Sequence, residues 1–185
     1  MILGIDKVLE LIKSKNLIEG IDPNNQNFEG CGVDVRIGEL YEMEEGDGFL
    51  HINTRKSPNF KLIAKFDEKN PAKIKLERGK TYSAKTIEKI NTPEDLMGWF
   101  IPRGTLYKCG ITVQGIRTDP GYCGNFTFIM TNNSKSDFEV EMGARIACMV
   151  FHKVDGKANM YKGQWQGGRA FIPEEEKQII TKEKI

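Results

Sequence analysis

The stretch F-I-P-R-G-T-L-Y-K-C-G-I-T-V-Q-G-I-R-T-D-P-G-Y-C-G-N-F-T-F-I-M-T-N, residues 100–132, decides how the rest of the chain is interpreted. Apolar runs rich in β-branched and aromatic residues alternate in it with glycine-containing turns, which is typical of β-strands joined by tight loops. Its basic, acidic and aromatic polar side chains gather at these turns: Arg103, Lys108, Arg117, Asp119 and Tyr122. Because grouped arginine and lysine side chains suit phosphate oxygens, we expect this stretch to bind a polyanion.

Outward from this stretch, the chain is a succession of short predicted strands. Val33, Val35 and Ile37 alternate with Asp34 and Arg36, which predicts a half-buried strand. Further strand-like runs occur at residues 73–76, 81–90, 97–101, 126–132, 138–142 and 144–154, E-E-G-D-G at 44–48 suits a hairpin tip, and 57–71 is expected to be partly strand. Turn signals at roughly ten-residue spacing predict a mainly β fold, either a distorted β-barrel, a jelly roll or a sandwich.

Two helical segments and a distinctive tail complete the expected organisation. Asp6 suits the N-cap of a docking helix over residues 6–19, with Gly20 ending it. N-T-P-E-D-L at 91–96 predicts a short helical turn led by Pro93. We expect residues 1–173 to form a single domain in which the segment 160–173, around Trp165, folds over the site as a lid; residues 174–185 are expected to be a solvated charged tail.

Composition narrows the classes of partner. The 185 residues carry a formal net charge of +1, so the strongly basic surface of a general nucleic-acid binder is missing. The N-terminus lacks the pattern of a signal peptide, and no run of about eighteen apolar residues occurs. We therefore expect a soluble, cytoplasmic protein that binds neither nucleic acid nor membranes. The four cysteines lack C-x-x-C spacing and are expected to be reduced thiols rather than zinc ligands: Cys31, Cys109, Cys123 and Cys148.

The block P-R-G-T-L-Y-K at 102–108 has the composition of a phosphate cradle. Arg103 offers a planar fork of donors and Lys108 a point charge, Gly104 allows close approach of the backbone, and Thr105 adds a hydroxyl. The Walker pattern G-x-x-x-x-G-K-[ST] is absent, so this is not a P-loop. The alternative is a surface turn whose basic residues are solvated.

The block R-T-D-P-G-Y-C-G at 117–124 predicts a tight turn with a positive φ at Gly121. Asp119 opens the turn, where an ionised carboxylate beside basic residues can activate a water molecule or help to bind a divalent cation. Tyr122 leaves the turn and presents a flat apolar face to a deoxyribose or a base. The alternatives are that Asp119 only caps the turn and that Tyr122 is a core aromatic.

Five ordered blocks resemble the dUTPase and dCTP deaminase superfamily, and most of all an archaeal-type dUTPase of the deaminase branch. They are G-V-D-V-R-I-G at 32–38, P-R-G-T-L at 102–106, R-T-D-P-G-Y-C-G at 117–124, G-A-R-I-A-C-M-V-F at 143–151 and Y-K-G-Q-W-Q-G-G at 161–168. The resemblance implies a distorted β-barrel or jelly roll that assembles as a homotrimer, with three sites at subunit interfaces. It also implies Mg²⁺-bound deoxyuridine or deoxycytidine triphosphate as the substrate.

The same resemblance implies roles for individual residues. Asp34 supports the site, and a neighbouring subunit supplies the phosphate ligands Arg103, Gly104, Thr105 and Lys108. The hairpin at Gln114, Gly115 and Arg117 reads the pyrimidine through its backbone, and Tyr122 packs beneath the deoxyribose. The tail contacts the base and phosphates through Tyr161, Gln164 and Gln166.

One departure from the family pattern decides the expected chemistry. In the deaminases a glutamate stands ten residues after the aspartate of the D-P-G turn and transfers protons at the cytosine ring; this chain has Ile129 there, which cannot transfer a proton. We therefore expect hydrolysis of dUTP to dUMP and pyrophosphate by an Asp119-activated water, with Mg²⁺ held through the substrate phosphates.

Further departures keep two alternatives open. Gly104 replaces a serine, Lys108 an arginine and Cys148 a glutamine of the family pattern, and the tail lacks the glycine-rich arm of ordinary dUTPases. The alternatives are a mono- or bifunctional dCTP deaminase and a non-catalytic trimeric deoxynucleotide-binding protein.

Overall fold

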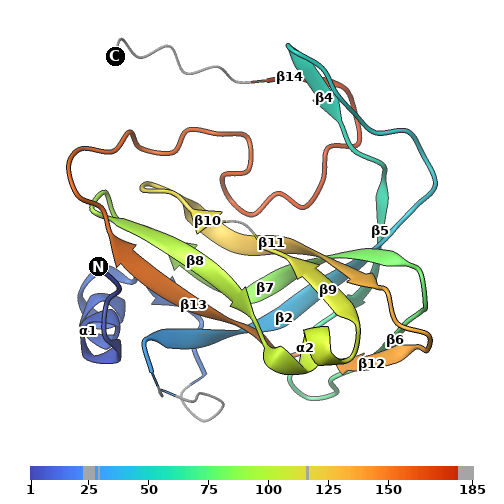
Figure 1. Ribbon diagram of the computed structural model, residues 1–185, viewed down its shortest axis with the longest axis horizontal. Helices are drawn as coiled ribbons and strands as arrows, with labels where there is room; N and C mark the ends of the chain where they lie inside the picture. The colour runs from blue at the N-terminus through green and yellow to red at the C-terminus, as the bar shows by residue number, and fades with distance from the viewer. Residues whose placement is uncertain (23–27, 29, 116, 179–185) are drawn as a thin grey trace.

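The computed structural model describes residues 1–22, 28, 30–115 and 117–178. Within them, the chain forms a curled half-barrel of β-strands with an N-terminal helix and one further short helix (Figure 1). The largest sheet follows the order β10-β8-β13-β2-β7-β11-β9, with β1 added beside β7 and β5 beside β2. Its strands are β1 (Ile18–Glu19), β2 (Gly32–Met43), β5 (Phe60–Lys65), β7 (Thr81–Asn91), β8 (Leu96–Pro102), β9 (Ile111–Gln114), β10 (Arg117–Thr118), β11 (Cys123–Asn132) and β13 (Arg145–Lys153). The expected mainly β fold class is confirmed.

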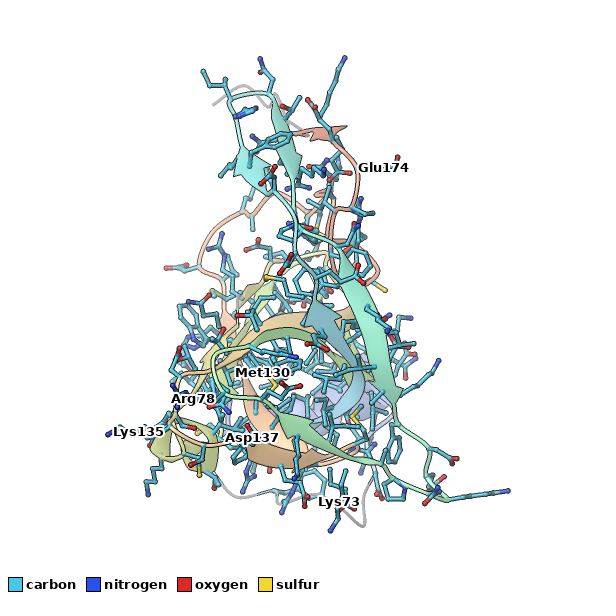
Figure 2. The ribbon with its side chains drawn as sticks, turned by 90° about the vertical axis from the view of Figure 1, so that its right-hand side faces the viewer. Lys73, Arg78, Met130, Lys135, Asp137 and Glu174 are labelled. Carbon is cyan, nitrogen blue, oxygen red and sulfur yellow. The ribbon has the colours of Figure 1, made fainter. Side chains whose placement is uncertain are left out.

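Two small sheets flank the large one. The first pairs β6 (Lys73–Leu76) with β12 (Phe138–Glu141). The second joins β3 (Phe49–Leu50), β4 (Thr54–Lys56) and β14 (Glu176–Lys177), and it stands beyond the end of the half-barrel (Figure 1). In the side view, Met130 lies inside the curl of the main sheet, and Glu174 lies far above it beside the second small sheet (Figure 2). The second small sheet therefore stands outside the main core, next to the tail.

The main core forms where the two halves of the curled sheet face one another. Phe100 of β8 packs against Phe126 and Phe128 of β11, with ring centroids 5.0 and 4.9 Å apart. Gly115 lies directly against the Phe100 ring, where a Cβ would collide with it. This close approach holds the connection between β9 and β10 against the core. The two strands do not form the expected hairpin, because β9 pairs with β11 and β10 pairs with β8.

The central strand β2 is buried on both faces, so the prediction of a half-buried strand is wrong. Val33, Val35 and Ile37 are fully buried as expected, but Asp34 and Arg36 are also only 6% and 7% exposed. The reason is that both polar side chains have buried partners. Arg36 Nε donates to Glu88 at 2.7 Å, and its Nη2 donates to the Gly20 carbonyl at 2.8 Å, so the segment after the first helix covers this face.

The N-terminal helix is shorter than predicted. Helix α1 spans Ile5–Lys15, with Gly4 rather than Asp6 at its N-cap, and it ends at Asn16, whose φ of 51° is left-handed. Asparagine tolerates this conformation, which turns the chain out of the helix. Ile18 then pairs with Ile90 of β7, because a β-branched residue beside a sheet gains ladder bonds and burial.

Four other local expectations are corrected. Residues 92–95 form a plain turn rather than a helical one. The connection from β7 to β8 consists of these four residues alone, which leaves no room for a helix between the strands. Residues 44–48 are not a hairpin tip, since β2 pairs with β5 and β3 pairs with β4. A short helix, α2 (Gly104–Lys108), occupies the block 102–108, for which the sequence predicts a phosphate cradle or, alternatively, a surface turn. Glu176 and Lys177 pair with β4, so this part of the tail is docked rather than solvated; residues 179–185 lie outside the described residues.

Among the described residues, no helix has the length and apolar character required to cross a lipid bilayer. Residues 57–71 contain β5, as the expectation of a partial strand requires.

Candidate active site

Two adjoining cavities lie between the sheet and the C-terminal tail, residues 160–178. The first, which we call the polar pocket, has a volume of about 400 Å³ and is lined by Arg117, Asp119, Tyr122 and Tyr161, among others. The second, the apolar pocket, has a volume of about 370 Å³ and is lined by Ile129, Phe171 and neighbouring apolar residues. Thr127 and Trp165 line both, so the two pockets share a boundary.

The aspartate of the polar pocket is held by a tight turn. Gly121 has a φ of +82°, as predicted, and the Tyr122 amide donates to the Asp119 carbonyl at 3.0 Å. The Gly121 amide donates to the Thr92 carbonyl at 2.9 Å, which fastens the turn to the β7–β8 connection. Arg117 Nε donates to Asp119 Oδ1 at 2.6 Å, while a third of the Asp119 side chain stays exposed. The carboxylate therefore has a fixed direction and remains accessible from the pocket.

Tyr122 also lines the polar pocket. The residue is 7% exposed, and its hydroxyl donates to the Asn125 carbonyl at 2.7 Å. Burial raises the pKa of the Tyr122 hydroxyl well above its usual value, so the phenol stays neutral. Its ring meets Tyr161 edge-on, with centroids 5.8 Å apart. Tyr122 therefore fits both interpretations of its role: its ring is mostly buried, as in a core aromatic, and it also lines the cavity where a ligand would lie.

The tail is docked directly on the aspartate turn. Gln166 accepts a hydrogen bond from the Cys123 amide at 3.0 Å and donates to the Gly121 carbonyl at 2.9 Å. The Gly167 amide donates to the Cys123 carbonyl at 2.9 Å, and Gly124 and Gly167 form a parallel bridge. A Cβ at Gly124 would overlap the backbone of Gly167, so this approach requires glycine. Gln166 therefore holds the turn through its backbone.

The other predicted site residues of the tail, and those at the connection from β9 to β10, lie in several places. Tyr161 and Gly115 line the polar pocket together with Arg117. Gln114 lies at the end of β9 and lines the apolar pocket. Gln164 points elsewhere in this structure, because its amide donates to the Lys177 carbonyl at 2.6 Å.

The predicted phosphate ligands are not beside Asp119 in this chain. Arg103, Gly104, Thr105 and Lys108 belong to α2 and its N-cap, at the lower end of the half-barrel, whereas β10 and the tail lie at its upper end (Figure 1). Arg103 and Thr105 line a separate cavity of about 220 Å³. The structure therefore does not bring this group and the polar pocket together within one chain.

Asp34 joins this separate group through ion pairs. Its carboxylate accepts a hydrogen bond from Arg103 Nη1 and lies 3.4 Å from Arg145 Nη1. Cys148 is its cross-strand neighbour on β13. Burial raises the pKa of the Cys148 thiol to about 11, and the Asp34 charge adds to this effect. The thiol is therefore protonated at neutral pH, which makes it a poor nucleophile.

A group of four side chains, which we call the tail strap, was not found from the sequence. Glu176 lies 3.0 Å from Arg55 Nη2 and 2.6 Å from Arg169 Nη1, and the Arg55 guanidinium lies 4.9 Å from the centre of the Trp165 ring. A tryptophan in a glycine-rich segment indicated a docked tail. Nothing in the sequence indicated Arg55 as its partner, because the two residues meet only through the tertiary fold.

Replacing Glu176 with glutamine is expected to loosen the tail. Partial burial raises the pKa of Glu176, but the hydrogen bonds from Arg169 and Arg55 outweigh it and leave the pKa below its usual value. A lowered carboxyl pKa adds stability that is complete above about pH 4.5 and disappears as the pH falls through the folded-state pKa. Fluorescence of Trp165, in a Trp99→Phe background, should therefore show an acid transition that Glu176→Gln removes. Glu175→Gln is the matched control and should keep the acid transition. If the transition also persists in Glu176→Gln, the tail strap does not hold the tail through Glu176.

The fold and the pockets define a class of protein: a β half-barrel in which an aspartate, an arginine and a buried tyrosine share a cavity under a docked tail. Residues 2–154 match the family model described as dCTP deaminase-like, and the chain belongs to this family.

Relatives within the family carry two different names. A deoxyuridine 5′-triphosphate nucleotidohydrolase of Methanocaldococcus jannaschii is 30% identical over 156 residues, which is 83% of this chain and 95% of that protein. A dCTP deaminase of Thermococcus kodakarensis is 28% identical and covers 85% of this chain and 90% of its own length. The solved structure of 2′-deoxycytidine 5′-triphosphate deaminase from Agrobacterium tumefaciens superimposes with a TM-score of 0.63 at 14% identity, over 83% of this chain and 48% of that one, and it shows the shared fold.

Proposed function

We propose that this protein hydrolyses dUTP to dUMP and pyrophosphate, with Asp119 as the general base. The observation that carries the proposal is the combination of residue types at two positions. Asp119 lies in the polar pocket, whereas the position of the deaminase glutamate holds Ile129, which lines the apolar pocket. A carboxylate is available to activate water, and isoleucine cannot transfer a proton to a cytosine ring.

The geometry of the turn suits a general base. Asp119 is fixed by its backbone bonds and by Arg117, and its side chain is accessible to a water molecule in the pocket. In the proposed step, Asp119 takes a proton from that water as the oxygen attacks the α-phosphorus. The bond between the α-phosphorus and its bridging oxygen breaks, and pyrophosphate leaves with the electron pair. Arg117 keeps the carboxylate directed at the water.

Tyr122 is proposed to select the sugar. Its hydroxyl is already bonded to the Asn125 carbonyl, so the residue offers the pocket a ring face rather than a hydroxyl. An aromatic face packs well against the apolar side of a deoxyribose. A ribose would bring its 2′-hydroxyl to this face without a hydrogen-bond partner, which disfavours UTP.

The side chains present fit a metal ion that arrives with the substrate. Among the described residues, no three or more histidine, cysteine, aspartate or glutamate side chains are grouped to hold a metal ion. Mg²⁺ commonly uses one or two carboxylates together with substrate phosphates, and Asp119 is a single carboxylate in the pocket. Mg²⁺ bound to the triphosphate would neutralise part of its charge.

We further propose that a second copy of the chain completes the site. Arg103, Thr105 and Lys108 belong to α2 and its N-cap, which lies at the opposite end of the half-barrel from β10, the strand that precedes Asp119 (Figure 1), so one chain alone lacks a full set of phosphate ligands. In the proposed homotrimer, this group faces the polar pocket of a neighbour. Arg103 would then contribute a planar donor fork to the phosphates.

A nucleotide panel tests the proposed reaction. Purified protein with Mg²⁺ should release pyrophosphate from dUTP at a rate well above that with UTP, and it should release no ammonia from dCTP. Pyrophosphate and ammonia are scored separately in each reaction. Ammonia from dCTP would place deamination first, and tight binding of a dUTP analogue without any turnover of dUTP would instead indicate a non-catalytic binder.

A further inference from the structure

The backbone of the turn that carries Asp119 is bonded on one side to the large sheet. The Gly121 amide donates to the Thr92 carbonyl at 2.9 Å, and the Thr92 amide donates to the Tyr122 carbonyl at 2.8 Å. Thr92 belongs to the short connection between β7 and β8, two strands of that sheet. This side of the turn is therefore fixed by the sheet itself.

The other side of the turn is bonded to the C-terminal tail. The Tyr161 amide donates to the Pro120 carbonyl at 2.6 Å, and the Gly167 amide donates to the Cys123 carbonyl at 2.9 Å. These two bonds join backbone groups, so they depend on the path of the tail rather than on the identity of its side chains. The tail thus meets the turn at two places, three residues apart.

One tail side chain adds two further bonds between these places. Gln166 Oε1 accepts a hydrogen bond from the Cys123 amide at 3.0 Å, and Gln166 Nε2 donates to the Gly121 carbonyl at 2.9 Å. A glutamine amide suits this task, because it carries an acceptor and a donor on the same carbon. Gly121 is then held from both directions, by the sheet through its amide and by the tail through its carbonyl.

Gln166 is placed differently from a substrate ligand. It is not among the described residues that line the polar pocket, although Tyr161 and Trp165 of the same tail are. Both polar atoms of its side-chain amide are also engaged by the turn. A side chain in this position acts on a nucleotide in the pocket through the backbone that it holds.

The residues that Gln166 bonds lie next to two pocket residues. Gly121 and Cys123 flank Tyr122, and Gly121 follows Asp119 by two positions; Asp119 and Tyr122 both line the polar pocket. The Asp119 carbonyl accepts a bond from the Tyr122 amide, so a displacement of the turn moves both residues together. A shift of about 1 Å in the groups that surround a reaction can cost as much as 10²-fold in rate.

We propose that Gln166 is a positioning residue that makes the direction of the Asp119 carboxylate depend on the docked tail. When Gln166 is bonded to the turn, the general base is held from two sides; when the tail leaves, only the sheet holds the turn. The inference rests on the proposed function, in which Asp119 is the general base. It gives Gln166 a different role from the substrate contact that the family resemblance implies.

Amide hydrogen exchange tests the contact without any catalysis. Gln166→Met keeps the length of the side chain and removes both hydrogen bonds, so the Cys123 amide should exchange roughly five- to tenfold faster, as the loss of one hydrogen bond implies. Gln178→Met is the matched control, because the Gln178 side-chain amide donates to the His51 carbonyl at 2.6 Å, away from the turn. It should leave exchange of the Cys123 amide unchanged. Equal exchange of this amide in the wild type and in Gln166→Met would overturn the inference.

Kinetics test the consequence for the general base. With dUTP and Mg²⁺, Gln166→Met should lower kcat roughly tenfold, because the base is no longer held in its direction. The Kd of the α,β-imido analogue of dUTP should change less than about twofold, because Gln166 contacts the turn rather than the ligand. Gln178→Met should keep the wild-type kcat. An unchanged kcat in Gln166→Met, or a loss of affinity as large as the loss of kcat/KM, would contradict the positioning role.

Failure of the proposed reaction gives a different result. A wild-type protein that hydrolyses no dUTP would overturn the proposed function, whatever the variants do. Exchange of the Cys123 amide would then still decide whether Gln166 holds the turn, because that measurement needs no substrate.

Discussion

Replacing Asp119 with asparagine is expected to lower kcat for dUTP hydrolysis by roughly 10²- to 10⁴-fold, the range that general-base catalysis supplies. Asparagine has nearly the same shape and keeps an oxygen that can accept the bond from Arg117 Nε, so the turn should persist. It cannot accept the proton of the attacking water. The loss should therefore fall on kcat, while the dissociation constant of the α,β-imido dUTP analogue changes only a few-fold.

The measurement is pyrophosphate release at saturating dUTP, together with calorimetric binding of the analogue. Asp95→Asn is the matched control, because it makes the same chemical change at an exposed aspartate in the nearby β7–β8 connection. This control should retain full activity. An Asp119→Asn protein with more than about a tenth of the wild-type kcat would remove Asp119 from the role of general base.

Replacing Glu88 with alanine is expected to lower the free energy of unfolding by about 3–5 kcal/mol, as breaking a buried ion pair typically does. Glu88 is fully buried and accepts two hydrogen bonds from Arg36 at 2.7 Å, one from the backbone amide and one from Nε. Burial raises the pKa of Glu88, and the bonds from Arg36 oppose that shift. Its removal would leave the Arg36 guanidinium, whose side chain is 8% exposed, without its nearest carboxylate.

Chemical denaturation measures this loss of free energy of unfolding. The protein concentration is kept fixed, because association of copies would itself change the apparent stability. Glu10→Ala, which breaks the exposed ion pair with Lys7, is the matched control and should change the free energy of unfolding far less. The double replacement Arg36→Met with Glu88→Leu should recover most of the loss, because a packed apolar pair needs no charge partner. A loss below about 1 kcal/mol in Glu88→Ala would show that the pair is not a central support of β2.

The parts of the structure that follow short-range rules were predictable from the sequence. Period-two alternation located β2, because successive side chains in a strand point to opposite faces. The strand-like run at 126–132 located most of β11, which begins at Cys123. The turn at Asp119 was predictable, since proline fixes φ in its own residue and glycine accepts the positive φ that the turn needs. Helix α1 was found but its end was misplaced, because the burial of Ile18 against β7 outweighs continued helical periodicity.

The candidate site was only partly predictable. Arg117, Asp119 and Tyr122 were expected together and lie in one pocket. Gln164 was expected at the substrate but donates to Lys177, because the docking of β14 beside β4 draws it away. The bond from Gln166 to the turn, and the placement of Arg55 over Trp165, join segments far apart in the chain, and no local pattern records such pairs.

The sequence by itself determined the strand periodicity, the aspartate turn and the ordered blocks that assign the family, because these depend on neighbouring residues and on spacing along the chain. Only the tertiary structure decided which strands pair and in which register. That register aligns Ser83, Ile129 and Gln114 across three strands, and the tail above them encloses the apolar pocket. The tertiary structure also places Arg103 and Asp119 at different cavities, although both residues belong to the same continuous stretch of sequence. Side-chain faces and distances in a sheet are set by long-range pairing, so they become visible only when the chain is folded.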